Sequence, residues 1–290
     1  MGAIKVGKAE IRRVEEMSIR SQLAAICPDE AFIAAHRHWL EPRFLNPDGT
    51  WNFIFQSWIM LVDDKIFVID PCTGNGRPHI YPMFDHLDTP YIERFGATGI
   101  NPEDVDYVFC THLHHDHCGW STRLRDGRFV PTFPNASYVY VKREYERWDT
   151  RRPNHRVVDY NVGVFERSVL PVMEAGLAKL VGGDHRLSSS VAIEPAYGHT
   201  EGHSILHLNS ERQEAYFTGD AFHHPIQIVD PAIHLMGCDN LELAIETRRR
   251  LVELCAERNA LIIPAHFSDP HAGWIRKRKG EVIFEALTTS

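Results

Sequence analysis

The chain has 290 residues, of which 43% are hydrophobic and 24% are charged, and its formal net charge is -8 at pH 7. This composition is typical of a folded globular protein. The negative charge disfavours a nucleic-acid-binding protein, because phosphate contacts need clustered Lys and Arg. No apolar stretch approaches the roughly 18 residues of a membrane span, so an integral membrane protein is also disfavoured.

The N-terminal residues and the cysteines bear on the cellular compartment. The first residues, which include Lys5, Lys8 and Arg12, lack the apolar core of a secretory signal. The six cysteines show no C-x-x-C spacing and no small disulfide framework. We therefore expect a cytoplasmic protein that acts on a small molecule and has no nucleic-acid or membrane partner.

The chain begins with a segment, residues 1–45, that precedes the motifs described below. It is predicted to contain two helices, Met17–Ala25 and Asp29–Leu40. We expect this segment to be an N-terminal extension that forms a homodimer contact or a lid.

Beyond this segment, apolar runs bounded by turn residues predict short strands. In chain order, these strands lie at residues 59–62, 65–70, 105–110, 137–141, 191–196, 204–208, 214–218 and 260–263. Helical patterns lie around residues 91–95, at 142–148, within 166–179 and at 241–258. Residues 121–137 are predicted to be loop and turn. No repeat or linker divides the chain, so we expect a single domain over residues 1–290.

The most informative motif is His112-Leu113-His114-His115-Asp116-His117, which directly follows the predicted strand 105–110. Neutral imidazole nitrogens and carboxylate oxygens are ligands that zinc and similar divalent ions prefer. His112 and His114 alternate along the chain, so in extended backbone their side chains leave the same face and can chelate one ion. Asp116 and His117 lie further round the loop and suit a second ion. A solvated or pH-sensing loop is the weaker interpretation.

Three later residues repeat the same arrangement of an apolar strand, a break and a candidate ligand. They are His199, Asp220 and His266. Since α/β folds build their sites at the carboxyl ends of strands, we expect these side chains to meet the histidine cluster at one edge of a sheet. Two ions need further histidines and an acidic bridge, and these residues offer both.

In this order, the motifs resemble those of the metallo-β-lactamase-fold hydrolase superfamily. The matching motifs are Asp70 at the end of an early strand, the cluster His112–His117, His199 in Gly-His-Thr-Glu-Gly-His, Asp220 in Thr-Gly-Asp, and His266 after a strand. The resemblance implies an α/β (α+β) fold, a four-layer αβ/βα sandwich with the metals at one edge.

The same resemblance implies the ligand sets of two divalent ions. One ion would bind His112, His114 and His199, and the other would bind Asp116, His117 and His266. Asp220 would bridge the two ions, and Asp70 would support a ligand from behind. We expect Zn2+, although iron, manganese and cobalt suit the same donors.

This centre predicts a dinuclear metal-dependent hydrolase that uses a metal-bound hydroxide, with oxyanion stabilisation by the second ion. The predicted catalytic residues are Asp116, which takes the proton, together with Asp220 and His223. His223 stands three residues after Asp220, where lactonases of the family often carry Tyr and methyl-parathion-hydrolase-like members carry His. Its alternative role, support of Asp220, is equally open. Trp120, Phe222 and His223 are the candidate substrate-binding residues.

The leading hypothesis for the substrate is a lactone, which the enzyme would open by ester hydrolysis. The alternatives are an organophosphate triester, an aryl ester or a β-lactam. The absence of a basic glutathione-binding region disfavours a glyoxalase-II-like thioesterase, and the acidic charge disfavours ribonuclease-Z-like processing. A non-enzymatic, metal-stabilised binding protein is disfavoured because a structural site closes its coordination around one ion.

Overall fold

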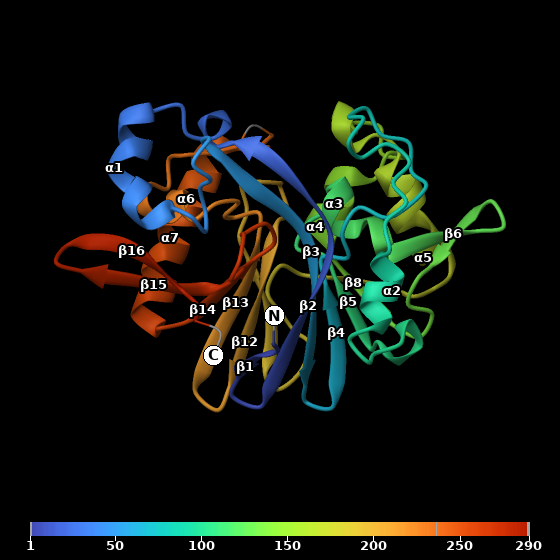
Figure 1. The fold of residues 1–290 in the computed structure, drawn as a ribbon. Helices are drawn as coiled ribbons and strands as arrows, with labels where there is room; N and C mark the ends of the chain where they lie inside the picture. The colour runs from blue at the N-terminus through green and yellow to red at the C-terminus, as the bar shows by residue number, and fades with distance from the viewer. Residues whose placement is uncertain (1, 236, 289–290) are drawn as a thin grey trace.

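Two seven-stranded β-sheets lie at the centre of the molecule, and helices cover the outer face of each sheet (Figure 1). The structure, a computed structural model, describes residues 2–235 and 237–288. The four layers are therefore helix, sheet, sheet and helix, which confirms the fold class predicted from the sequence. No helix in these residues is both long and apolar enough to cross a membrane.

The first sheet has the strand order β1-β2-β3-β4-β5-β8-β9. Its strands are β1 Ile4–Val6, β2 Ala9–Gln22, β3 Thr50–Val62, β4 Lys65–Ile69, β5 Tyr107–Phe109, β8 Ser137–Val141 and β9 Ala178–Val181. The second sheet runs in order from β10 to β16. Its strands are β10 His185–Arg186, β11 Val191–Pro195, β12 Ser204–Ser210, β13 Gln213–Gly219, β14 Leu261–Pro264, β15 Gly273–Arg278 and β16 Glu281–Ala286. A separate hairpin consists of β6 Thr122–Arg125 and β7 Arg128–Pro131.

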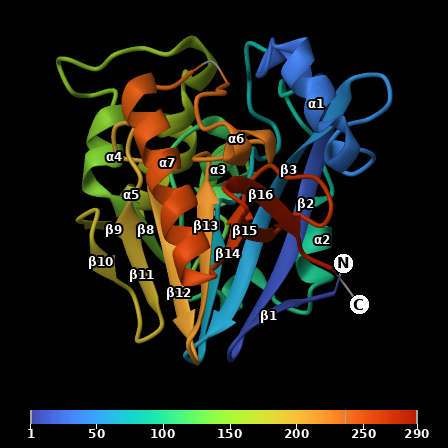
Figure 2. The same ribbon diagram turned by 90° about the vertical axis from the view of Figure 1, so that its left-hand side faces the viewer.

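The helices fall into two sets, one on each outer face, with α3 His115–Cys118 at the sheet edge (Figures 1 and 2). The helices that cover the first sheet are α2 Tyr91–Gly96, α4 Lys142–Trp148 and α5 Leu170–Glu174. Those that cover the second sheet are α1 Glu30–Leu40, α6 Ile226–Val229 and α7 Leu241–Arg258.

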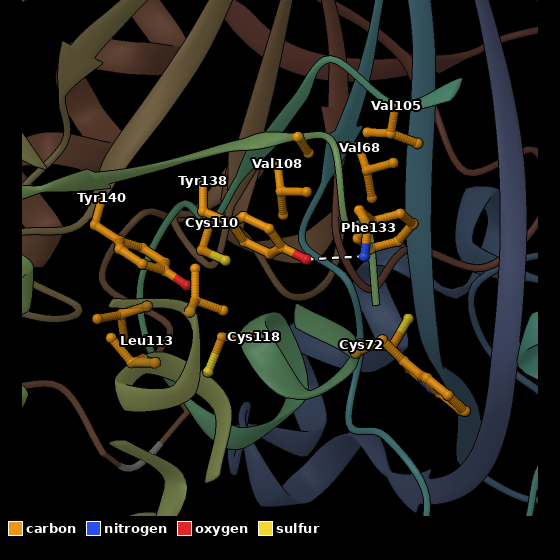
Figure 3. Packing of buried hydrophobic residues seen from close by; sticks show 14 of the residues in the cluster. Val68, Cys72, Val105, Val108, Cys110, Leu113, Cys118, Phe133, Tyr138 and Tyr140 are labelled. Atoms are coloured by element: carbon orange, nitrogen blue, oxygen red, sulfur yellow. Dashed lines mark hydrogen bonds between the residues drawn. The ribbon is translucent and has the colours of Figure 1, made fainter. Parts of the chain in front are cut away.

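Both faces of the central strands are buried, which explains their nearly continuous apolar sequences. On β5, Val108 faces the helices and Phe109 faces the other sheet. On β14, Ile262 faces α7 while Ile263 lies between the sheets. Figure 3 shows the cluster beneath α4, in which the hydroxyl of Tyr138 accepts a 2.9 Å hydrogen bond from the backbone N–H of Phe133.

Most predicted elements are confirmed. The helix at 241–258 has the predicted bounds, and the side chain of Asn240 caps it by accepting a bond from the N–H of Leu243. The helix predicted at 29–40 forms after Asp29, whose side chain caps it in the same way. The strands at 204–208 and 214–218 pair antiparallel as β12 and β13.

The predicted helix Met17–Ala25 is wrong over most of its length, because residues 17–22 belong to β2. This strand pairs with β3 from Glu10 to Gln22, and its side chains alternate between buried and less buried positions. Sheet pairing over this length outweighs the helix propensity of a short segment. Residues 4–6 and 9–22 are therefore strands of the first sheet.

Two other regions also differ from the prediction. Residues 122–131, predicted as loop, form the hairpin β6–β7 around Asp126-Gly127, and both turn residues have positive φ values, 51° and 76°. The helical segment predicted within 166–179 ends at Glu174, and the chain turns at Gly176 into β9. The basic run at residues 276–279, whose charge predicted a solvated helix face, lies instead in the hairpin of β15 and β16.

Leu206 on β12 tests the core between the sheets, because its side chain is fully buried there. Leu206→Ala should lower the free energy of unfolding by about 2–5 kcal/mol, as expected for a buried Leu. Leu180→Ala, at a position that is 38% exposed on β9, should change it by less than about 1 kcal/mol. Urea unfolding of both variants measures the difference, and equal effects would contradict the described core.

Candidate metal centre

The predicted metal ligands come together at the carboxyl ends of the central strands. The chain after β5 leads through His112 into α3, and the segments after β11, β13 and β14 lead to His199, Asp220 and His266. Within each sheet, the neighbouring strands β4 and β5, and β13 and β14, run parallel, so their carboxyl ends meet at one edge. The structure thus has the convergence of strand ends that the sequence predicted.

Four side chains form a first set that could hold a metal ion, and we call it group 1: His112, His114, His199 and Asp220. Nδ1 of His114 lies 2.9 Å from Nε2 of His112 and 3.1 Å from Nε2 of His199. Oδ2 of Asp220 lies 3.3 Å from Nε2 of His199. Ligand atoms around a tetrahedral zinc, at bond lengths of about 2.0–2.1 Å, stand about 3.3 Å apart, so this spacing fits one ion.

A second set, group 2, consists of Asp116, His117 and His266. The Nε2 atoms of His117 and His266 are 3.3 Å apart. Oδ2 of Asp116 lies 3.7 Å from each of these nitrogens. Group 2 therefore presents three donor atoms toward one point.

The carboxylate of Asp220 lies between the two groups. Its Oδ2 faces group 1, whereas its Oδ1 lies 3.2 Å from Nε2 of His117 and 3.0 Å from Nε2 of His266. Within the described residues, this Oδ1 is buried and receives no hydrogen bond. A buried carboxylate oxygen without a donor is costly unless a cation compensates it. The donor set therefore fits two cations that share one carboxylate.

The outer nitrogens of the two group 2 histidines differ in their partners. Nδ1 of His266 donates to the carbonyl oxygen of Ile54 at 2.7 Å. Nδ1 of His117 lies 3.1 Å from Oδ2 of Asp70 but makes no hydrogen bond within the described residues. A proton on Nδ1 of His266 leaves the lone pair of its Nε2 directed into the centre, as a metal ligand requires. Asp70 thus lies beside the outer nitrogen of His117, and its support of that residue as a ligand stays a prediction.

The electrostatics of the two groups differ. Burial, helped by neighbouring imidazoles, holds the pKa of His112 well below its usual value and lowers the pKa of His114 to about 3. At His117, burial alone would lower the pKa, but the carboxylates of Asp220, Asp116 and Asp70 outweigh it and raise the pKa. Group 1 therefore holds neutral imidazoles, and group 2 lies where positive charge is favoured.

Apolar and carboxylate anchors hold the loop that carries the histidine cluster. The side chains of Leu113 and Cys118, which alternate with the candidate ligands, lie in the core beneath α4 and α5 (Figure 3). Asp70 accepts hydrogen bonds from the backbone N–H and the hydroxyl of Thr111 at 2.7 and 2.9 Å. At Gly119, a Cβ atom would lie 1.7 Å from the carbonyl oxygen of Thr73, so only glycine permits this close approach.

The three candidate substrate-binding residues lie in different surroundings. His223 is 2% exposed, and its Nε2 lies 3.1 Å from Oδ2 of Asp220. Phe222 is fully buried beneath α6 and α7. Trp120 is buried in the core of the first sheet, where it stacks on Tyr91 and its indole N–H donates to Glu16. Of the three, only His223 reaches the two groups.

Sequence reasoning missed several residues around the centre. The hydroxyl of Tyr160 lies 3.3 Å from Nε2 of His114, and the ring of Trp148 packs edge-on against the ring of His114. His79 packs against His115 with 4.3 Å between ring centroids. The buried carboxylate of Glu144 binds the loops of group 1. None of these residues lies in a local motif that could have revealed it.

Comparison with known proteins agrees with this geometry. Residues 52–266 match the model of the metallo-beta-lactamase superfamily. The chain belongs to the metallo-beta-lactamase superfamily. This confirms the family predicted from the motifs, and residues 52–266 form a metal-dependent hydrolase domain of that superfamily.

Curated relatives within the superfamily are lactonases. An N-acyl homoserine lactonase from a Bacillus species is 24% identical over 182 residues, which are 60% of this chain. The matched region spans 61% of the length of that relative. An N-acyl homoserine lactonase from Bacillus cereus is also 24% identical, over 176 residues.

Solved structures share the whole fold of this superfamily member. AidC, a dizinc quorum-quenching lactonase solved with its product, superposes with a TM-score of 0.78 at 18% identity, over 99% of this chain and 97% of that one. The hydrolase AbOPH superposes with a TM-score of 0.82 at 20% identity, over 100% of this chain and 98% of that one. At these identities, the similarity shows the fold.

Single ligand substitutions should separate the two groups. His199→Ala should leave group 2 loaded, and His266→Ala should leave group 1 loaded, so each variant should bind one ion per chain where the unsubstituted protein binds two. Elemental analysis after gel filtration measures this ratio, with His38→Ala, at an exposed position on α1, as the matched control. Retention of two ions in both variants would contradict the assignment of these histidines.

Proposed function

We propose that this chain is a dinuclear metal-dependent hydrolase that opens lactones. The observation that carries the proposal is the division of the Asp220 carboxylate, with Oδ2 facing group 1 and Oδ1 facing group 2. In this proposal, group 1 and group 2 would each hold one divalent ion, and Asp220 would offer one carboxylate oxygen to each group. Bound ions would activate a water molecule as the nucleophile and polarise the scissile carbonyl group.

The residues around the ions would orient them and accept the proton of the attacking water. At Asp116, burial raises the pKa, but His115, His117 and His266 outweigh it and lower the pKa to about 2. This residue is therefore a carboxylate at neutral pH, and its Oδ2 already faces the imidazoles of group 2. We assign proton acceptance to this oxygen.

Zinc is the ion that the donor set favours most. All donors are imidazole nitrogens and carboxylate oxygens, which suit Zn2+ and also iron, manganese or cobalt. Cys118, although it adjoins the cluster, donates its thiol to the carbonyl oxygen of His114 at 3.2 Å and supplies no ligand.

The relatives and the surroundings of the site support a lactone with an apolar substituent. The curated relatives described above are N-acyl homoserine lactonases. Two loops near the centre, joined by a 2.9 Å contact between Nε2 of His79 and the carbonyl oxygen of Tyr160, carry exposed apolar side chains. These side chains are Ile80, Tyr81, Met83, Val157 and Val162. Such a surface favours binding of a substrate with an apolar part.

His223 is the feature that favours the second candidate, an organophosphate triester or aryl ester hydrolase. Among family members, methyl-parathion-hydrolase-like enzymes resemble this chain at this position. The imidazole could donate a hydrogen bond to a carbonyl or to a phosphoryl oxygen, so the residue is compatible with either substrate. We further propose that the protein acts on a small molecule, that it is cytoplasmic and that it forms a homodimer.

A substrate panel tests the proposed specificity. We expect kcat/KM to be highest for lactones with an acyl side chain and lower by at least about tenfold for aryl esters, phosphotriesters and β-lactams. Activity should disappear on treatment with a chelator and return with Zn2+. The highest kcat/KM on a phosphotriester would establish the second candidate instead, and chelator-resistant activity would exclude both.

His223→Phe tests the role of the imidazole beside Asp220. The phenyl ring fills the same space but cannot donate to Oδ2 of Asp220, whose orientation we expect to loosen. By analogy with other groups that orient metal ligands, we expect kcat/KM to fall by about 10–100-fold. If the metal content falls together with kcat/KM, the imidazole of His223 acts by orienting Asp220. If KM or kcat changes while two ions stay bound, the imidazole contacts the substrate.

A further inference from the structure

Glu144 is a buried carboxylate on α4 that belongs to neither metal group. Its side chain is 2% exposed, and it forms no ion pair with a Lys or Arg of the described residues. A charge in such a place is costly, and burial raises its pKa. The ionised carboxylate is therefore stable here only if surrounding groups donate hydrogen bonds to it.

Four hydrogen bonds surround this carboxylate, two on each oxygen. Oε1 accepts from the backbone N–H of Leu113 at 2.9 Å and from the indole N–H of Trp148 at 2.6 Å. Oε2 accepts from the hydroxyl of Thr200 at 2.7 Å and from the backbone N–H of Gly202 at 3.0 Å. All donors are neutral, so the carboxylate is fully paired without a cation.

The donors come from the two loops that carry the histidines of group 1. Leu113 lies between His112 and His114, and Thr200 directly follows His199. The two loops belong to different sheets and are almost ninety residues apart in the chain, yet one carboxylate binds both. Glu144 therefore joins the two loops that carry His114 and His199, whose facing nitrogens are 3.1 Å apart.

Packing around Glu144 leaves the loops little freedom. A Cβ atom on Gly202 would lie 2.2 Å from the backbone nitrogen of Glu144, so the second loop rests directly on α4. Trp148, one turn further along α4, packs its ring edge-on against His114 with 5.2 Å between centroids. One face of α4 thus fixes both loops of group 1.

A different carboxylate, Asp70, lies beside group 2. Oδ2 of Asp70 lies 3.1 Å from Nδ1 of His117, and Glu144 makes no hydrogen bond to Asp116, His117 or His266. We propose that Glu144 is a positioning residue that sets the metal affinity of group 1 and leaves that of group 2 unchanged. This inference rests on the proposed dinuclear function.

Glu144→Gln tests the inference with little change in size. The amide oxygen still accepts hydrogen bonds, but the NH2 group faces two donors and repels one of the loops. Titration of the metal-free protein with Zn2+ against a chromophoric chelator resolves the two binding steps. We expect one step to weaken by about 10–100-fold and the other to change by less than about threefold. Glu146→Gln, at an exposed position on the same helix, is the matched control and should change neither.

Combination with ligand variants identifies the affected group. In His266→Ala, which keeps group 1, Glu144→Gln should weaken the remaining Zn2+ site by the same factor. In His199→Ala, which keeps group 2, it should have no effect on the remaining site. Equal weakening of both sites, or lower unfolding stability with unchanged Zn2+ affinity, would overturn the inference.

Thr200→Val provides a milder change if Glu144→Gln does not fold. It removes one donor to Oε2 and keeps the shape of the side chain, and it should weaken the same step by a smaller factor. An effect on the other step would contradict the inference. Binding of only one Zn2+ by the unsubstituted protein would instead contradict the proposed dinuclear function, so the two failures are distinguishable.

Discussion

The position of the Asp220 carboxylate between two sets of imidazoles is the constraint on which the centre depends. Its backbone N–H donates to Nε2 of His203 at 3.1 Å, and the Nδ1 of His203 is held by the carbonyl oxygen of Ala196. The preceding Gly219 has a positive φ of 49°, and a Cβ atom there would lie 2.4 Å from the hydroxyl oxygen of Thr111. Strand β13 can therefore place Asp220 at the centre only by ending in a glycine. His203, which is in neither metal group, thus holds the backbone of Asp220 in place.

Buried carboxylates fix the conformation of the loops around the centre by accepting hydrogen bonds from their backbone N–H groups. Loops leave many backbone N–H groups unpaired, and burial makes each of these groups costly. Asp70 and Glu144 accept such groups near the metal ligands, and Glu16 accepts the N–H groups of Thr73 and Gly74 at 2.7 and 3.0 Å. Each carboxylate thus replaces the hydrogen bonds that a sheet or helix would supply. Metal ligands placed on such loops keep a fixed geometry, which favours binding without large rearrangement.

The sequence predicted the strand ends and the ligand motifs because both are local patterns. Strands buried on both faces read as continuous apolar runs, and His112 and His114 occur two residues apart on one loop. The contacts of Glu144 and Tyr160 could not be predicted, because they join segments far apart in the chain and neither residue lies in a motif. The strand over residues 17–22 was missed because its partner, β3, lies about thirty residues away. The hairpin at Asp126-Gly127 had a recognisable local signal that the prediction passed over.

The candidate metal ligands and the exposed apolar side chains beside them are held by different parts of the structure. This difference suggests a different function for each part. The metal ligands follow strands whose side chains lie in the cores on both faces of the sheets, so their positions are tied to the stability of the fold. The apolar side chains beside the centre, such as Ile80 and Val162, lie on loops and are 55% and 57% exposed. Substitution on these loops disturbs little of the core, whereas substitution at strand ends disturbs both folding and metal binding. In the proposed hydrolase, the sheets would therefore set the reaction chemistry, and the loops and His223 would select among esters, lactones and phosphotriesters.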